Sequence, residues 1–160
     1  MAEQEKLALA KETFVTLCKA LDNNDYKYHR NDEKLSVEFG VRGDDIPMDF
    51  LIKVDVQRQF VMILSPVNVS TDEDKRLDMA VAISIINNKI VNGSFDFDIS
   101  TGKMYFRMVN SFMDSELGEE LFTYMIFGAA SIIDDYNDKF LMLSKGIISL
   151  EQFIDSEQSQ

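Results

Sequence analysis

The sequence has very few of the residues on which catalytic and metal sites are usually built. It has one cysteine, Cys18, and one histidine, His29, in 160 residues. A single cysteine excludes an intrachain disulfide, and one histidine offers too little for a transition-metal site or a catalytic triad. We expect His29 to be structural or solvated. Cys18 lies on the apolar side of a predicted helix, where a buried and unreactive thiol is expected.

Long hydrophobic runs and positive charge are also scarce. No stretch approaches the roughly 18 apolar residues of a membrane span, and residues 1–6 lack the apolar stretch of a signal peptide. Because 16 basic residues stand against 28 acidic ones, the formal net charge is −12, which repels nucleic-acid phosphates. We therefore expect a cytoplasmic protein whose partner is neither a nucleic acid nor a membrane.

The sequence does have the composition of a folded domain. Hydrophobic residues make up 46% and charged residues 28% of the chain, and 160 residues are enough for one domain with a substantial core. We find no internal repeat or linker. The prediction is a single domain over residues 1–160, with its core at about 4–143 and a short carboxy-terminal helix at about 149–157, opened by a capping box at Ser149.

Hydrophobic periodicity predicts a helix, a block of three to four strands, a second helix, a two-strand hairpin and a third long helix. These elements are expected at about 4–21, then 26–30, 35–41, 48–56 and 60–64, then 70–88, then 95–99 and 104–108, and finally 114–143. Strands joined by short turns favour an antiparallel sheet, here of five to six strands, with helices packed on it. The predicted fold class is therefore α+β.

Two segments are more apolar than one buried face requires. Phe60–Leu64 is continuously apolar, which indicates a central strand or one covered on both faces. The helix at 70–88, opened by a predicted capping box of Ser70 and Glu73, is apolar enough to be buried on most of its circumference.

One carboxylate pair suggests ligand chemistry. Asp96 and Asp98 lie two apart on a predicted strand and so share a face, as a divalent-cation site would need. Alternation with Phe95, Phe97 and Ile99 already explains both acids as the solvated side of that strand, and hard cations usually take several more oxygen ligands. A small-ligand or divalent-metal module using the acids near Asp96 and Asp98 is our alternative hypothesis, and no cofactor is expected.

The segment from Met108 to Asp138 combines acidic and apolar character. It contains seven acids and no lysine or arginine. Methionines and phenylalanines gather in and beside it, most of them at core spacing: Met104, Met108, Phe112, Met113, Phe122, Met125 and Phe127. Adaptable apolar side chains ringed by acids would suit a peptide or a partner helix. We predict partner contacts at Tyr105, Arg107, Phe112 and Met113; the alternative is that all four close the sheet or a homodimer seam.

The predicted hairpin also carries a family resemblance. An asparagine pair ends a helix, a Gly-x-Phe strand and a glycine turn follow, and an aromatic-x-Arg strand completes the hairpin; the residues are Asn87, Asn88, Gly93, Phe95, Gly102, Tyr105 and Arg107. With the element order over about 4–143, this pattern resembles the YbjN-domain family of bacterial proteins, described as sensory transduction regulators. The resemblance implies a fold like that of type III secretion chaperones, whose members bind other proteins, often as dimers. It implies no reaction.

These observations predict a non-enzymatic protein-binding module. Its role would be chaperone-like or regulatory, and it would bury a partner segment or form a dimer. The absence of a recognisable nucleophile with its base, and of a metal cluster, is the reason that we do not expect an enzyme.

Overall fold

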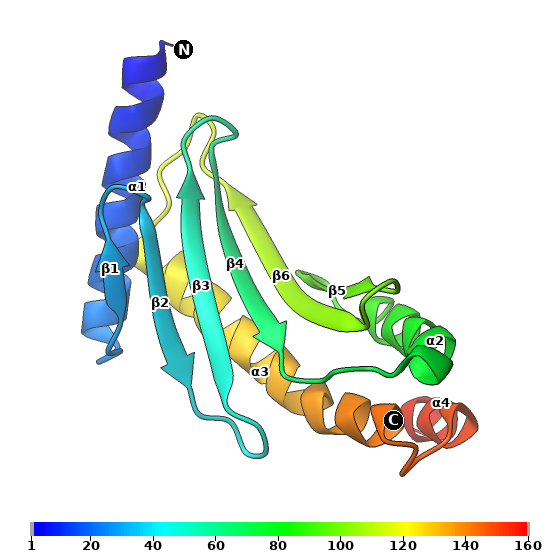
Figure 1. Cartoon of the computed structure of the whole chain (residues 1–160). Helices are drawn as coiled ribbons and strands as arrows, with labels where there is room; N and C mark the ends of the chain where they lie inside the picture. Colours follow the sequence, from blue (N-terminus) through cyan, green and yellow to red (C-terminus); the bar gives the residue numbers. More distant parts are fainter. Residues whose placement is uncertain (1, 160) are drawn as a thin grey trace.

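The structure, a computed structural model, describes residues 2–159 and confirms the α+β class (Figure 1). Within these residues there are four α-helices, one short 3-10 helix (η1) and six strands. Their bounds are α1 Glu3–Asn23, β1 His29–Asn31, β2 Ser36–Val41, β3 Met48–Asp55, β4 Phe60–Val67, η1 Glu73–Lys75, α2 Arg76–Asn87, β5 Ser94–Asp98, β6 Lys103–Ser111, α3 Glu119–Ser144 and α4 Leu150–Gln158. No helix in this part of the chain is long and apolar enough to cross a membrane.

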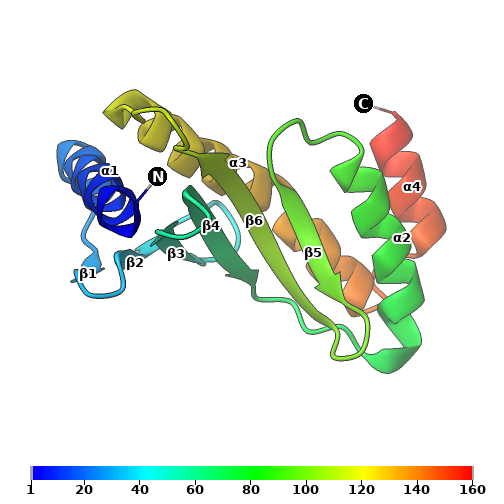
Figure 2. The ribbon, with the colours of Figure 1, turned by 90° about the horizontal axis from the view of Figure 1, so that it is seen from above.

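The six strands form one antiparallel sheet in the order β1-β2-β3-β4-β6-β5. The prediction that Phe60–Leu64 is a central strand is confirmed, since β4 pairs with β3 on one side and β6 on the other. The helices pack against one face of this sheet, with α3 crossing behind β4 and β6 (Figures 1 and 2). No helix or strand among residues 2–159 therefore covers the opposite face of the central strands.

The core lies between the sheet and the helices. Its carboxy-terminal half is built on four phenylalanines, each at most 2% exposed, that come from four different elements: Phe95, Phe106, Phe140 and Phe153. Phe95 lies edge-on to Phe106 and to Phe140, each with 5.1 Å between ring centroids, and Phe140 stacks on Phe153 at 6.0 Å. These contacts join β5, β6, α3 and α4 in one cluster. Cys18 is 2% exposed, as predicted, and burial raises the pKa of its thiol.

The structure corrects the second helix. The predicted capping box at Ser70 does not form, because the amide of Thr71 donates to the carbonyl of Gly102 at 3.2 Å and ties this segment to the β5–β6 turn. The helical region begins at η1 instead, and α2 follows from Arg76. Burial on most of the circumference is also wrong: Leu77 is 73% and Val81 45% exposed. The cause is that α2 contacts β5, α3 and α4 on one side only.

The ends of the last two helices differ in how well they follow the sequence pattern. The third long helix begins at Glu119 and not near residue 114, because Asp114 adopts a left-handed backbone with φ of 50° and the chain turns there. Its predicted end is confirmed, since Gly146 follows with φ of 69°. The predicted cap of α4 is present too: the hydroxyl of Ser149 accepts from the amide of Gln152 at 3.1 Å.

The asparagine at the end of α2 has a structural role. The side-chain oxygen of Asn87 accepts from the amide of Phe95 at 2.8 Å, and its side-chain nitrogen donates to the carbonyl of the same residue at 3.0 Å. Asn87 therefore pairs with the outermost strand β5 as a neighbouring strand would. Asn88, by contrast, is exposed.

We predict that Asn87→Ala destabilises the protein by about 1–3 kcal/mol, because it leaves a partly buried amide and carbonyl of Phe95 without partners. Asn88→Ala is the matched control and should change the free energy of unfolding by less than about 0.5 kcal/mol. Urea denaturation measures both, and hydrogen exchange should show faster exchange of the Phe95 amide in the first variant alone. Equal losses in the two variants would contradict the role given to Asn87.

Candidate functional site

The uncovered face of the sheet is apolar along its central strand. All four outward-facing side chains of β4 are apolar, and we call them the β4 row: Phe60, Met62, Leu64 and Pro66. The inward-facing positions of the same strand are buried against the helices. A strand that is apolar on both faces normally has a layer on each of them. Here only one of the two layers is present in the structure.

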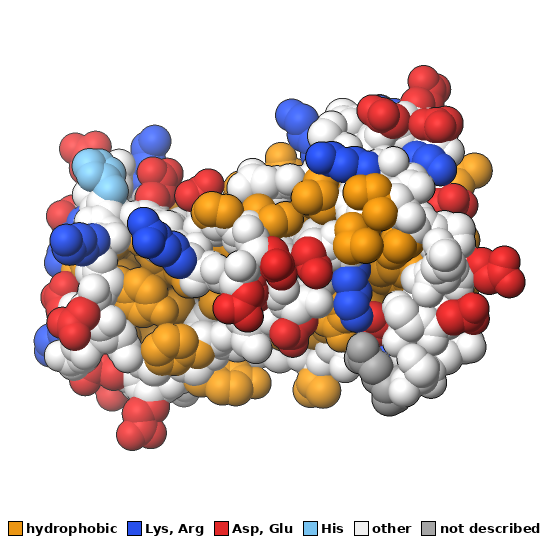
Figure 3. All heavy atoms as spheres, turned by 90° about the horizontal axis from the view of Figure 1, so that it is seen from below, with side chains coloured by type: hydrophobic (Ala, Val, Ile, Leu, Met, Phe, Trp, Pro, Cys, Tyr) orange, Lys and Arg blue, Asp and Glu red, His pale blue; other side chains and the backbone are white. Residues whose placement is uncertain are grey.

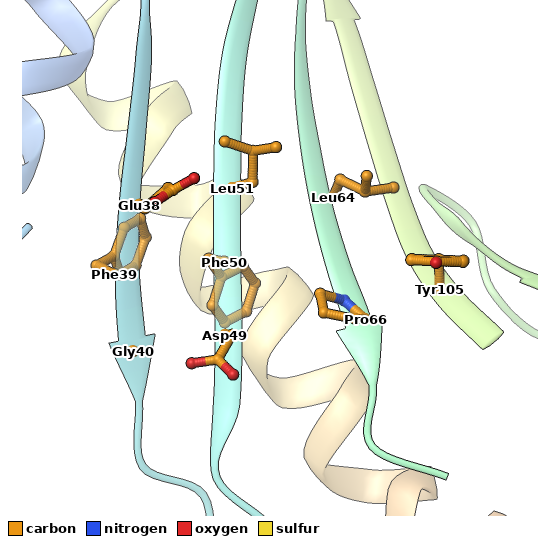
Figure 4. A pocket seen from close by; sticks show the side chains of 9 residues that line it. All are labelled: Glu38, Phe39, Gly40, Asp49, Phe50, Leu51, Leu64, Pro66 and Tyr105. Atoms are coloured by element: carbon orange, nitrogen blue, oxygen red, sulfur yellow. The ribbon is translucent and has the colours of Figure 1, made fainter. Parts of the chain in front are cut away.

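The neighbouring strands widen this apolar row. The register places Leu51 of β3 opposite Leu64 and Tyr105 of β6 opposite Pro66, and Figure 4 shows these four side chains on adjacent strands. We call the β4 row and the outward side chains around it the open face; the surrounding residues are Glu38, Asp49, Leu51, Lys53, Asp55, Arg58, Tyr105, Arg107 and Val109.

The open face is hollowed at the end that holds Pro66. A hollow of about 540 Å³ lies there, and its apolar lining includes Leu51, Leu64, Pro66 and Tyr105. Proline has no amide hydrogen to donate, and the β3–β4 ladder ends at the Leu51–Leu64 pair, short of Pro66. The hydroxyl of Ser65 donates to the carbonyl of Asp49 at 2.6 Å in this region. The interruption of the ladder therefore lies at the hollow.

A second hollow, of about 490 Å³, lies at the other end of the open face. Phe60, Met62 and Val109 supply its apolar side chains. Lys53 and Arg58 line it as well, and both are exposed. The β4 row thus connects two shallow depressions, one at each end of the strand.

The two ends of the open face carry opposite charges. Glu38 and Asp49 line the hollow at the Pro66 end, and Lys53 and Arg58 line the hollow at the Phe60 end. None of the ion pairs within residues 2–159 involves any of these four side chains. Arg107, which also faces outward, is paired with Asp96 at 2.9 Å. Asp55, opposite Phe60 in the register, also lines the hollow at the Phe60 end and has no ion pair among the described residues. The charges without an ion pair are therefore acidic in the Pro66 hollow and predominantly basic in the Phe60 hollow.

Further acids lie beyond the acidic end. The carboxylate of Asp134 on α3 accepts from the amide of Asp44 in the β2–β3 turn, at 2.9 Å. Partial desolvation and the nearby carboxylates of Asp138, Asp134 and Asp44 raise the pKa of Asp45. Figure 3, which views the molecule from below, shows acidic side chains gathered at the middle of this end of the molecule. The negative potential at this end thus comes from several elements.

The four predicted partner contacts differ in their location and in their exposure to solvent. Tyr105 and Arg107 lie on the open face, next to Pro66 and Leu64 in the register. Met113 is 58% exposed beyond the end of β6, whereas Phe112 is 0% exposed, with its amide donating to the carbonyl of Gln59. Phe112 therefore belongs to the core and fits the alternative of a side chain that closes the sheet. Most of the methionine and phenylalanine cluster is likewise buried: Met104, Met108, Phe122 and Met125.

Asp96 and Asp98 are both engaged in local contacts. Asp96 forms its ion pair with Arg107 and accepts from the hydroxyl of Ser94. Asp98 accepts from the hydroxyl of Ser100 at 2.6 Å and from its amide at 3.0 Å, and these hydrogen bonds lower the pKa of Asp98. Within residues 2–159, no group of three or more His, Cys, Asp or Glu side chains is arranged to hold a metal ion.

Sequence reasoning missed the β4 row as a candidate site. Its signal was present, because Phe60–Leu64 is apolar at successive positions and one of the two explanations for such a strand is cover on both faces. The sequence could not show that the helices lie together on one side. It also gave no reason to extend the strand through Pro66, since proline is disfavoured inside a sheet.

Comparisons with known proteins support the fold. No family model and no curated protein matches the chain. Among solved structures, YbjN from E. coli, described as a candidate transcription regulator, has a TM-score of 0.56 at 15% identity, covering 79% of this chain and 92% of YbjN. A chain of the HopA1-SchA chaperone-effector complex has a TM-score of 0.53 at 11% identity, covering 79% and 95%. The chain therefore has a YbjN-like, chaperone-like α+β fold, as the sequence resemblance implies.

Proposed function

We propose that this protein is a non-enzymatic, cytoplasmic protein-binding module, chaperone-like or regulatory, that buries a partner segment against its open face. The observation that carries the proposal is the β4 row, a line of four apolar side chains on an interior strand with no layer over it. Apolar surface of this kind on a folded domain is typical of an interaction site.

The structural similarities agree with this proposal. One of the similar structures is a chaperone-effector complex, so a chain of this fold occurs in a protein assembly. Fold similarity alone does not assign a function, and the proposal therefore rests on the apolar residues of the open face. Tyr105 and Arg107 remain predicted contacts, because they border the β4 row on β6. Met113 remains one at the end of that strand.

A double variant, Met62→Asp with Leu64→Asp, tests the proposal. Both side chains are only partly buried and face outward, so the change should leave the fold intact. It places two charges where apolar contacts are expected, and binding of a partner should weaken at least about tenfold. Val81→Asp on the exposed side of α2, outside the open face, is the control.

The partner itself is found by photo-crosslinking. A photoreactive amino acid at position 62 should crosslink, in native lysate, to one defined segment of an identified protein, whereas the same group at position 81 should not. The affinity of that protein, once purified, is then measured for the wild type and both aspartate variants. Equal affinity for all three proteins would refute a binding site on the open face.

A further inference from the structure

The open face also indicates what kind of segment it accepts, an inference that rests on the proposed function. We infer that the partner segment is an amphipathic helix of about 13 residues lying along the β4 row, with a basic end over Glu38 and Asp49 and an acidic end over Lys53 and Arg58. Three observations lead to this inference: the pairing of the central strands, the length of the β4 row, and the unpaired charges at its ends.

The pairing of the strands favours a helix over an extended peptide. β3, β4 and β6 are each hydrogen-bonded to a neighbour on both sides along most of their length, so most of their backbone groups are already paired. Where the β3–β4 ladder stops short of Pro66, the carbonyl of Asp49 accepts from the hydroxyl of Ser65. An extended peptide lying over apolar side chains would leave its own amides and carbonyls without partners. A helix satisfies its backbone internally and can present one apolar side to the sheet. On the opposite face, α3 packs against β4 and β6 in this way.

The length of the β4 row sets the length of the helix. From Phe60 to Pro66 the strand advances six residues, or about 20 Å at about 3.3 Å per residue. A helix rises about 1.5 Å per residue, so about 13 residues span the row. The two hollows then lie under the two ends of the helix, where larger side chains have room.

The charges at the two ends of the open face set the orientation of the bound helix. Glu38 and Asp49 at one end and Lys53 and Arg58 at the other have no ion-pair partner among the described residues, and all four are exposed. Asp55 also lines the second end, where the two basic side chains outnumber it. A segment with the opposite arrangement would pair with both ends at once. The reversed arrangement would set like charges against each other at both ends, and such repulsion discriminates between orientations. The acids of the β2–β3 turn strengthen the negative end.

A synthetic peptide tests the inference without knowledge of the natural partner. The probe is an amphipathic helix of about 14 residues with leucines on one side, glutamates at its amino end, lysines at its carboxyl end and no net charge. A neutral probe is needed because the protein has a net charge of −12. A spin label on the lysine end broadens nearby amide signals, and circular dichroism follows helix formation.

The matched control exchanges the charges of the open face. The variant Glu38→Lys, Asp49→Lys, Lys53→Glu and Arg58→Glu keeps the net charge unchanged and alters only exposed side chains. We expect the label to broaden the signals around Asp49 in the wild type. In the variant it should broaden those around position 58, with a preference of about fivefold for the favoured orientation in each case.

Three outcomes would overturn the inference: the same orientation in both proteins, a bound peptide that stays extended, or exclusion of the peptide by a second copy on the open face. Its failure can be told apart from failure of the proposed function. If the probe does not bind but the double variant Met62→Asp with Leu64→Asp still loses the crosslinked partner, the proposed function stands and the helix inference is wrong. If the probe does not bind and no partner is lost from the double variant, both the helix inference and the proposed function are wrong.

Discussion

Replacing Phe140 by alanine should destabilise the protein by about 3–5 kcal/mol, the largest effect that we expect from a single substitution. The side chain of Phe140 is 0% exposed and contacts rings from two other elements, Phe95 of β5 and Phe153 of α4. Its removal leaves a cavity at the junction of α3, α4 and the sheet, which a rigid sheet and a long helix cannot close by relaxation. Urea denaturation followed by circular dichroism measures the loss.

Phe127 provides the control within the same helix. It is 52% exposed, and its ring lies 6.3 Å from that of Tyr26. Phe127→Ala removes the same atoms from α3 without opening a buried cavity, and it should cost less than about 1 kcal/mol. A loss below about 1.5 kcal/mol for Phe140→Ala, or equal losses for the two variants, would contradict the position of Phe140 in the core.

Replacing Glu157 by glutamine should cost about 2–4 kcal/mol at neutral pH. The carboxylate is 1% exposed and binds two lysines, Lys139 from α3 at 2.7 Å and Lys89 after α2 at 2.8 Å. The neutral amide cannot pair with both cations, which are then left partly buried. Their side chains are 26% and 37% exposed, so water can compensate in part. Glu151→Gln, at an exposed position of the same helix, is the matched control.

The same carboxylate makes stability depend on pH. Burial on its own would raise the pKa of Glu157, but the hydrogen bonds from Lys139 and Lys89 outweigh it and hold the pKa below the ordinary value of 4.5. A lowered folded-state pKa gives stability that is fully present above pH 4.5 and is lost as the pH falls through the folded-state value. Unfolding free energies of the wild type and Glu157→Gln should therefore converge as the pH falls below 4.5. A constant difference from pH 7 to pH 3 would show that the ion pairs do not stabilise the fold.

Most of the fold could be predicted because local periodicity and sheet register agree. Strand β3 alternates cleanly, and the structure finds the predicted residues inside. In β2, Val37 and Phe39 are buried as predicted, and Ser36 is buried as well. The errors fall where one long-range contact outweighs a local pattern. Thr71 binds the β5–β6 turn and so prevents the predicted cap, and Asp114 takes a backbone conformation that no local signal marks. The exposed side of α2 could not be predicted either, because its neighbours come from distant parts of the chain.

Only part of the candidate site could be predicted from the sequence. Tyr105 and Arg107 could be placed on one face by their spacing, and they do share it. The burial of Phe112 was not predicted, although the two-residue period of Met104, Phe106 and Met108 places it on their buried side when continued past the end of β6. The β4 row needed the arrangement of the helices, which no pattern within a single strand contains.

The pairing between Asn87 and Phe95 has a consequence for how the sheet can grow. A strand at the edge of a sheet usually offers its free amides and carbonyls to another chain, by strand addition or in aggregation. At Phe95 both groups are already engaged by a side chain of α2. At the opposite edge, β1 is only three residues long. A seventh strand thus finds little to pair with at either of these points, and the protein offers other molecules side chains instead of backbone.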